Sequence, residues 1–283
     1  NLLPLANFAL NTYGDDPCSC FALKGTNTYE QPELELNLKM HKAISVIQFK
    51  AEGQAIRRHP EFGLGHRNLL QQIDYEKGTI FLDGKDYPLL DTNFPTIDPA
   101  DPCRFTEQEA DIMDRLAKAF MGCEKLQKHM KFLLANGSLY KVYNNNLLYH
   151  GCVPLNEDGT LKEVEIYGKR YKGRALYDVL DNYVRKGFVA VDEEEREKGR
   201  DLMWYIWLSE NSPLFGKDKM ATFERYFLAE KETHREVKKP LLQVSGKTRR
   251  SLTGSSGNSG LSRRGRILST DMCRSKEKTE RVR

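Results

Sequence analysis

A single histidine followed by a glycine closes the apolar run 147–149 in the segment LLYHGCVPLNEDG. An imidazole at the carboxyl end of a buried strand can bind a metal ion, and a glycine beside it lets the backbone pass close to that ion. Hydrolases that use metal ions need ligands on such rigid supports, which makes His150 a candidate metal ligand. A histidine that only forms a hydrogen bond at a strand end fits the same residues. The motif alone leaves both interpretations open.

Basic side chains gather just before a predicted helix in the segment YGKRYKGRALYDVL, and another basic pair occurs in LFGKDK. Cationic side chains near a helix start can bind the phosphate of a sugar phosphate. The candidate substrate contacts are Arg170, Lys172, Arg174 and Lys217. A solvated basic face that binds nothing is the alternative for all of them.

The elements around these residues alternate between helix and strand. Helical spacing of apolar residues runs through LKMHKAISVIQFKAEGQAIRRHPEF and predicts a helix that stops at His59-Pro60. A capping box of Thr106 and Glu109 opens the clearest helical region, which is a single helix or a broken pair, and a further helix is predicted over RALYDVLDNYVRKGF. Hairpins are predicted at three turns: Asp83-Gly84, Asn144–Asn146 and Gly168. The expected fold class is mixed α/β.

Two composition regimes meet near Pro240. The last forty residues hold eleven Lys or Arg against three Asp or Glu, so they carry +8, and residues 1–243 carry −4 of the net +4. The tail has no aromatic residue and cannot bury enough apolar surface to offset the entropy of ordering. We therefore expect a mainly helical region over 1–135, a mixed segment over 136–240, and a disordered basic tail over 241–283.

Charge, cysteines and hydropathy narrow the function class. The mildly acidic body argues against a nucleic-acid-binding protein, and no stretch is apolar enough to cross a membrane. Six cysteines lack the paired spacing of a zinc site, which favours reduced thiols in a soluble, cytoplasmic protein. An oligomer is compatible with the sequence. The aromatic residues of the later segment are expected in the core: Trp204, Trp207, Phe215, Phe223, Tyr226 and Phe227.

Several long strings, among them GSLYKVYNNNLLYHGCVPLNEDGTLKEVEI and GRDLMWYIWLSENSPLFGKDKMATFERYF, closely resemble the class III fructose-1,6-bisphosphatases of bacteria. The resemblance covers residues 1–240. It implies a branch of the metallophosphoesterases, similar to the Ser/Thr protein phosphatases, with a sheet that this chain would contain only in part. The implied reaction is hydrolysis of the 1-phosphate of fructose 1,6-bisphosphate, a step of gluconeogenesis, by water activated at a two-metal site that usually holds manganese.

The resemblance also assigns roles. A strand-end His-Gly pair supplies a metal ligand in the protein phosphatases, and Tyr149-His150-Gly151 matches it. This match favours the ligand interpretation of His150. The string from Asp201 to Trp204 resembles an Asp-Leu-Leu-Trp string of the phosphatases, so that Asp201 would lie at a strand end and either orient the site or serve the structure alone.

Other motifs of the resembled superfamily are missing. Its early Asp-x-His, Gly-Asp-x-x-Asp and Gly-Asn-His strings do not occur, and YGDDPC and LGHRN are interpreted as unrelated. The chain starts with Asn1, and we expect an internal fragment that is inactive alone. The codons for Ser269 to Lys276, read one base out of frame, permit Asn-Gly-His-Val-Pro-Val-Lys, which resembles the late metal motif. The tail is therefore interpreted as an out-of-frame translation. A passive tail and an anion-binding tail are the alternatives.

Two rivals to the bisphosphatase interpretation stay open. One is a catalytically dead relative that binds phosphosugars, and the other is a metallophosphatase of the same scaffold with a different phosphoester substrate.

Overall fold

The computed structural model describes residues 2–22, 31–144, 146–237, 241–242 and 266–269. The chain forms two compact units, and each is described here by itself. Unit 1 comprises Asn1–Ala135 and Ala221–Arg235, and unit 2 comprises Asn136–Met220 and Glu236–Arg283. Residues 221–235, expected in the second segment, belong to unit 1 instead.

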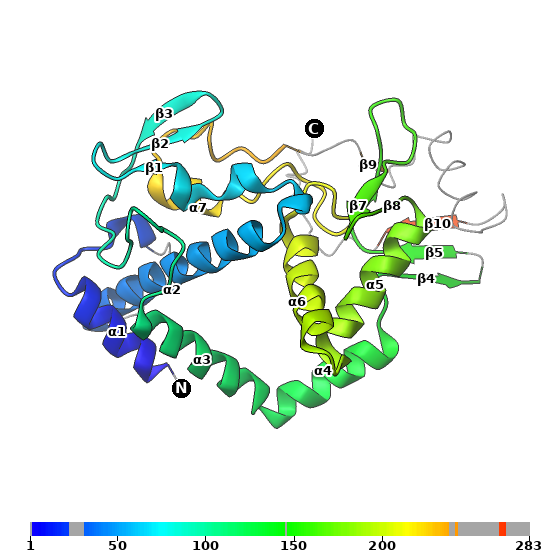
Figure 1. Ribbon diagram of the computed structural model, residues 1–283, viewed down its shortest axis with the longest axis horizontal. Coiled ribbons are helices and arrows are strands. Elements are labelled where there is room, and N and C mark those ends of the chain that lie inside the picture. Colours follow the sequence, from blue (N-terminus) through cyan, green and yellow to red (C-terminus); the bar gives the residue numbers. More distant parts are fainter. Residues whose placement is uncertain (1, 23–30, 145, 238–240, 243–265, 270–283) are drawn as a thin grey trace, which may run out of the picture. The chain divides into compact units, whose positions relative to one another are not determined.

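Unit 1 is built around one long helix, α2, with shorter helices and a small sheet packed on it (Figure 1). Its helices are α1 (Leu3–Tyr13), α2 (Gln31–Arg58), α3 (Glu107–Met121), α4 (Glu124–Asn136, whose last residue falls in unit 2) and α7 (Thr222–Phe227). Short 3₁₀ helices cover Ser19–Phe21, Pro60–Phe62, Gly65–Arg67 and Leu69–Gln72.

α2 ends where the sequence predicts it to end. Its last residue is Arg58, and the residue before a proline is pushed out of the helical region. α3 begins with the expected capping box, in which the Thr106 hydroxyl accepts from the Glu109 amide and the Glu109 carboxylate accepts from the Thr106 amide. The helical region is a broken pair, since α3 and α4 are separated at Gly122 and Cys123.

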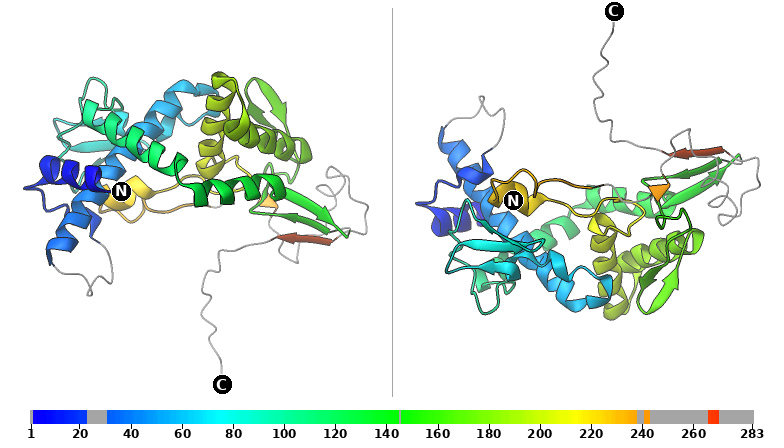
Figure 2. Two further views of the ribbon diagram at one scale, coloured as in Figure 1. Left: turned by 90° about the horizontal axis from the view of Figure 1, so that it is seen from below. Right: turned by 90° about the horizontal axis from the view of Figure 1, so that it is seen from above.

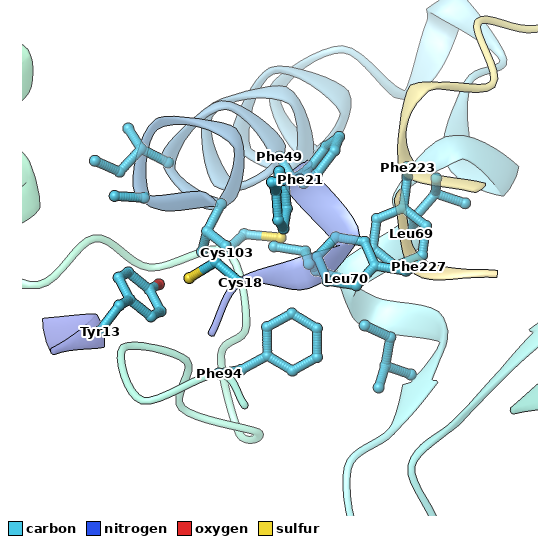
Figure 3. Packing of buried hydrophobic residues seen from close by; sticks show 14 of the residues in the cluster. Tyr13, Cys18, Phe21, Phe49, Leu69, Leu70, Phe94, Cys103, Phe223 and Phe227 are labelled. Carbon is cyan, nitrogen blue, oxygen red and sulfur yellow. The ribbon is translucent and has the colours of Figure 1, made fainter. Parts of the chain in front are cut away.

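Aromatic side chains from both ends of the chain meet in the core of unit 1 (Figure 3). The rings of Phe223 and Phe227 on α7 pack against Phe49 on α2, and Phe227 also contacts Phe21 and Phe94. This packing explains why residues 221–235 belong to unit 1. The chain leaves the unit, forms most of unit 2, and then returns to complete the first core.

A three-stranded antiparallel sheet borders this core. It consists of β1 (Ile73–Asp74), β2 (Thr79–Leu82) and β3 (Lys85–Pro88). Asp83 and Gly84 join β2 to β3 with positive φ angles of 51° and 84°. A two-residue turn with positive φ at both positions matches the twist of paired strands, which confirms the hairpin predicted from Asp-Gly.

Unit 2 contains two packed helices, α5 (Arg174–Val189) and α6 (Glu193–Leu208). They approach closely at two glycines: a Cβ built on Gly199 would lie 2.2 Å from the Gly187 backbone nitrogen. Asp192 caps α6 by accepting from the Glu195 amide at 2.9 Å. Trp207 on α6 is 68% exposed, so the expectation that it lies in the core is wrong.

The strands of unit 2 form three small sheets. The largest has the order β10-β5-β4, in which β4 (Tyr140–Tyr143) and β5 (Asn146–Tyr149) are antiparallel and β10 (Arg266–Ser269) is parallel to β5. β7 (Val164–Ile166) and β8 (Lys169–Tyr171) form the hairpin expected at Gly168, and β6 (Val153–Pro154) pairs with β9 (Leu241–Leu242).

The mixed α/β class expected from the sequence is confirmed by these elements. The tail expectation lies mostly outside the described residues. Within 241–283 the structure describes two short strands, β9 and β10, and the interpretation of the whole tail stays a prediction.

Candidate functional site

His150 follows the last residue of the central strand β5. The strand is held in the sheet by two buried side chains, Leu147 and Tyr149, which belong to one hydrophobic cluster with Val153 and Tyr177. Because side chains alternate along a strand, the residue after Tyr149 leaves the buried face, and His150 is exposed. The imidazole therefore stands at the end of an anchored strand and is open to solvent.

The packing of the backbone around residue 151 requires a glycine. Its φ is +80°, and a Cβ at this position would lie 2.4 Å from the Pro213 carbonyl oxygen. The next residue, Cys152, donates its amide to the same carbonyl at 2.8 Å. A glycine is thus required here because the 213–214 backbone crosses the chain immediately after His150. This crossing fixes the backbone that carries the imidazole.

The sheet places the carboxyl ends of two parallel strands at the edge where His150 lies. β10 runs parallel to β5, with Ser269 opposite Tyr149. The two strands lie side by side in Figures 1 and 2. Ligands of α/β proteins commonly bind at the carboxyl ends of parallel strands. Tyr149 is the last residue of β5, so the imidazole of the next residue, His150, lies at this edge.

The opposite face of β5 is anchored on helix α5 and forms a small apolar pocket lined by tyrosines. The Tyr177 hydroxyl donates to the Cys152 carbonyl at 2.6 Å, and burial raises the pKa of this phenol well above its usual value. Tyr140 on β4 donates to Asp178 of the same helix at 2.9 Å. These bonds tie strands and helix together, so the strand that carries His150 has a rigid support.

Each basic residue predicted to contact substrate lies near a carboxylate. Arg174 lies 3.4 Å from Asp178, one turn further along α5. Cross-strand and loop partners complete the set: Arg170 with Glu165 at 3.8 Å, Lys172 with Glu163 at 3.1 Å, and Lys217 with Glu236 at 2.7 Å. The first three are exposed ion pairs and would have to be exchanged for a phosphate. Their role as phosphate contacts stays a prediction.

Asp201 does not lie at a strand end, and that expectation is wrong. It lies inside helix α6, where it is buried. The segment folds as a helix because three glutamates follow the Asp192 cap and because Leu202, Tyr205 and Ile206 recur at helical spacing. The similarity of a four-residue string to a phosphatase motif carried less information than this pattern.

The described residues do not fit a complete metal site. Among them, no three His, Cys, Asp or Glu side chains are placed to hold an ion together. His150 supplies one imidazole, and a two-ion centre needs several further ligands. The carboxylate of Asp16, in the YGDDPC string, forms an ion pair with the buried Lys42 at 2.5 Å.

Helix α2 carries two buried lysines that are not among the residues expected from the sequence to have a special role. Lys42 and Lys50 lie eight residues apart, on the same face of the helix as the buried Val46. Lys42 pairs with Asp16 and Asp91, and Lys50 with Glu109. The signal was available, because a lysine at core spacing on a helix requires an acidic partner. These pairs belong to unit 1, whereas His150 belongs to unit 2.

None of the described helices is both long and apolar enough to cross a membrane. The described cysteines are all free, as expected: Cys18, Cys20, Cys103, Cys123 and Cys152.

Comparison with known proteins gives a consistent result. Residues 1–251 match the family described as Firmicute fructose-1,6-bisphosphatase. Similar curated proteins named class 3 fructose-1,6-bisphosphatase occur in Bacteroides fragilis (52% identity over 242 residues), Clostridioides difficile strain 630 (54% over 246) and Clostridium acetobutylicum (52% over 243). These alignments cover 84–86% of this chain and 36–37% of the relatives. No solved structure matches significantly.

The chain therefore spans little more than a third of the length of these relatives. The resemblance seen in the sequence strings is confirmed over the region where it was proposed. The chain belongs to the Firmicute fructose-1,6-bisphosphatase family.

Proposed function

We propose that the complete protein is a metal-dependent phosphatase that hydrolyses the 1-phosphate of fructose 1,6-bisphosphate in gluconeogenesis, and that this chain contributes His150 to its metal centre. The observation that carries the proposal is the family match over residues 1–251. The five free cysteines are compatible with a cytoplasmic location, where thiols stay reduced. The chain alone is expected to be inactive.

The placement of His150 supports a ligand role over a structural one. A histidine that served only to end the strand would be expected to hydrogen-bond to its neighbours, whereas this side chain is exposed beyond an anchored strand. A rigid backbone on both sides, through the β5 pairing and the contact of Gly151 with Pro213, is what a metal ligand requires. The other ligands of a manganese pair would come from outside the described residues.

We also propose that the tail beyond about Pro240 is an out-of-frame translation, which its abrupt change in composition supports. β10 ends at Ser269, beside Tyr149. The shifted frame begins its Asn-Gly-His string at the Ser269 codon and would also change the residues that form β10. Sequencing the nucleotides that encode residues 240–283 tests the idea. A stop codon in the shifted frame, or the absence of a Gly-His pair, would exclude it.

The activity itself is tested on the complete protein, expressed from the contiguous gene with the tail in the frame that the nucleotides support. We expect phosphate release from fructose 1,6-bisphosphate in the presence of Mn²⁺. Replacing His150 with alanine should lower kcat/KM by about 100-fold or more, because loss of a ligand should cost at least as much as loss of its supporting contacts. Lys141→Ala, an exposed change on the neighbouring strand β4, is the matched control.

Two other outcomes would redirect the proposal. Binding of the sugar bisphosphate without phosphate release would indicate a catalytically dead binding protein. Phosphate release from other phosphoesters, but not from this one, would indicate a phosphatase of another specificity. Equal activity of the His150→Ala variant and the parent would refute the ligand role.

The proposed phosphate contacts are tested in the same protein. Lys217→Met removes a cation while keeping most of the side-chain volume. A rise in KM with little change in kcat is expected if Lys217 binds the substrate in its ground state. An unchanged KM, together with a lower stability, would show that Lys217 serves only its ion pair with Glu236.

A further inference from the structure

The apolar stripe of helix α3 is longer than the core that covers it. Ile112, Leu116 and Phe120 recur at four-residue spacing and so lie on one side of the helix. Ile112 is only 4% exposed and Leu116 is half-buried, but Phe120 is 63% exposed. The start of α3 is fixed in unit 1 by Glu109, whose carboxylate pairs with Lys50 at 2.7 Å. The helix therefore runs from the core outward with its apolar side uncovered.

Helix α4 carries a similar apolar stripe, but none of its residues belongs to a buried core. Leu126, Met130 and Leu133 recur at intervals of four and three residues, and none of the 13 residues of the helix is buried. Leu133 is 58% exposed. Lys128 and Lys131 lie on the opposite side of the helix. An amphipathic helix of this kind is typical of an element that packs against another surface.

The two helices are joined by a hydrogen-bonded turn, and Figure 1 shows α3 leading directly into α4. The Gly122 amide donates to the Lys118 carbonyl at 2.8 Å, and the Gln127 amide donates to the Cys123 carbonyl at 2.9 Å. Cys123 is exposed between them, next to Met121, which is 67% exposed. The α3–α4 surface is defined here as Phe120, Met121, Cys123, Leu126, Met130 and Leu133.

A helix of 13 residues is marginal in water, and helices of this length owe most of their stability to packing of the apolar side. Contiguous exposed apolar side chains on a protein surface usually mark a contact with another surface. α4 thus has the pattern of a packed helix, although none of its residues is buried by the described part of the chain.

We propose that the α3–α4 surface is covered, in the complete protein, by polypeptide that lies outside these 283 residues. The alignments support this occupant, because the relatives carry almost two thirds of their length beyond the part that matches this chain. A segment on the same polypeptide is present at high effective concentration and meets the surface without a loss of association entropy. The inference rests on family membership and on exposure, and it does not depend on catalytic activity.

Cys123 provides a natural reporter of this contact. Its thiol lies within the surface and is exposed, whereas burial raises the pKa of Cys18 and of Cys152 to about 12. The 283-residue chain and the complete protein are treated with N-ethylmaleimide, and modification of the peptide that contains Cys123 is followed by mass spectrometry. We expect the complete protein to react at least about tenfold more slowly at Cys123, as for a site that must open first.

A cysteine introduced at Lys77, an exposed position between β1 and β2, is the control for general reactivity. It should react at the same rate in both proteins. Equal rates at Cys123 in both proteins would overturn the proposal. Slow modification of Cys123 in the 283-residue chain would also overturn the proposal. Slowing that increases with protein concentration would show that a second copy covers the surface. Slowing at every concentration would show that the chain covers the surface itself.

A pair of variants separates contact from simple folding defects. Leu133→Glu places a charge on the α3–α4 surface and should restore fast modification of Cys123 in the complete protein. Lys131→Glu, on the opposite side of α4, changes the charge by more and should leave Cys123 protected. Neither variant should change the midpoint of unfolding of the 283-residue chain. Protection that survives Leu133→Glu would refute the assigned surface.

Discussion

Gly151 and Pro213 lie in such close contact that a single added carbon would collide: a Cβ at 151 would be 2.4 Å from the Pro213 carbonyl oxygen and 3.0 Å from the Leu214 backbone. The same carbonyl accepts the Cys152 amide. The chain segment that carries His150 is therefore held in place by the 213–214 backbone. This contact can be tested without reference to any metal ion.

Gly151→Ala is expected to destabilise unit 2 by about 2–4 kcal/mol, because alanine is strained at positive φ and its methyl group must displace backbone. Urea unfolding monitored by circular dichroism measures the loss. Gly159→Ala is the matched control. Its φ is also +80°, but no atom lies within 4 Å of the added carbon, so only the smaller conformational cost of about 1 kcal/mol should appear. Equal effects of the two changes would contradict the steric argument.

A second prediction concerns the buried pair of Lys50 and Glu109. Glu109→Gln leaves the Lys50 ammonium buried without its carboxylate and should cost about 3–5 kcal/mol in the free energy of unfolding. Asp114→Asn removes a carboxylate from an exposed pair with Lys118 on the same helix and should cost less than about 1 kcal/mol. Denaturant titration of both variants gives the comparison. A similar loss in both would show that burial of the pair does not matter.

Local signals in the sequence predicted local structure well. The turns at Asp83-Gly84 and Gly168, the proline after His59 and the Thr106 capping box each fix a backbone geometry within a few residues. The corresponding hairpins and helix ends occur where these signals place them. Such signals act over one turn, so no distant contact can override them easily.

Two features of the fold differ from the sequence-based expectations, one for a long-range reason and one for a local reason. The return of residues 221–235 to unit 1 depends on Phe223 and Phe227 meeting Phe49, a contact that no local pattern indicates. At Asp201, the helical pattern of the 16 residues Glu193–Leu208 determines the local structure, and the four-residue string similar to a phosphatase motif does not. His150 is a candidate because its chemistry and its strand end coincide, and no metal-binding group of three His, Cys, Asp or Glu occurs among the described residues.

A third prediction follows from the environment of Asp16. Burial by itself would raise the pKa of this carboxyl, but hydrogen bonds from Lys42, the Cys18 amide and Asn93 favour the charged form and leave the pKa below its usual value. A lowered pKa in the folded state stabilises the fold above the unfolded-state pKa of about 3.9, and this contribution disappears as the pH falls through the folded-state value.

The stability difference between the parent and Asp16→Asn should therefore be largest near neutral pH and shrink below about pH 5. Urea unfolding between pH 7 and pH 3 measures it, and Asp86→Asn, an exposed change on β3, controls for the loss of a surface carboxylate. A difference that stays constant over this range, or grows in acid, would show that Asp16 is not held in its charged form.

A fourth prediction uses two buried thiols as reporters of the two units. Cys18 lies in unit 1 and Cys152 in unit 2, and burial raises the pKa of each thiol to about 12. At pH 8 neither should react with iodoacetamide in the folded chain, because almost no thiolate is present and both side chains are buried. Each should react once its own unit unfolds. Rapid alkylation of either thiol in native conditions would contradict the burial described here.

The last prediction concerns the return of the chain to unit 1. Phe227 on α7 is fully buried against Phe21, Phe49, Phe94 and Phe223, so Phe227→Ala should cost unit 1 about 3–5 kcal/mol through lost burial and a cavity. In a urea titration, alkylation of Cys18 should move to lower denaturant while alkylation of Cys152 stays in place. Lys231→Ala, an exposed change in the same returning segment, should move neither. A parallel shift of both thiols would mean that the two units unfold as one, and a shift of Cys152 alone would show that residues 221–235 stabilise unit 2 instead.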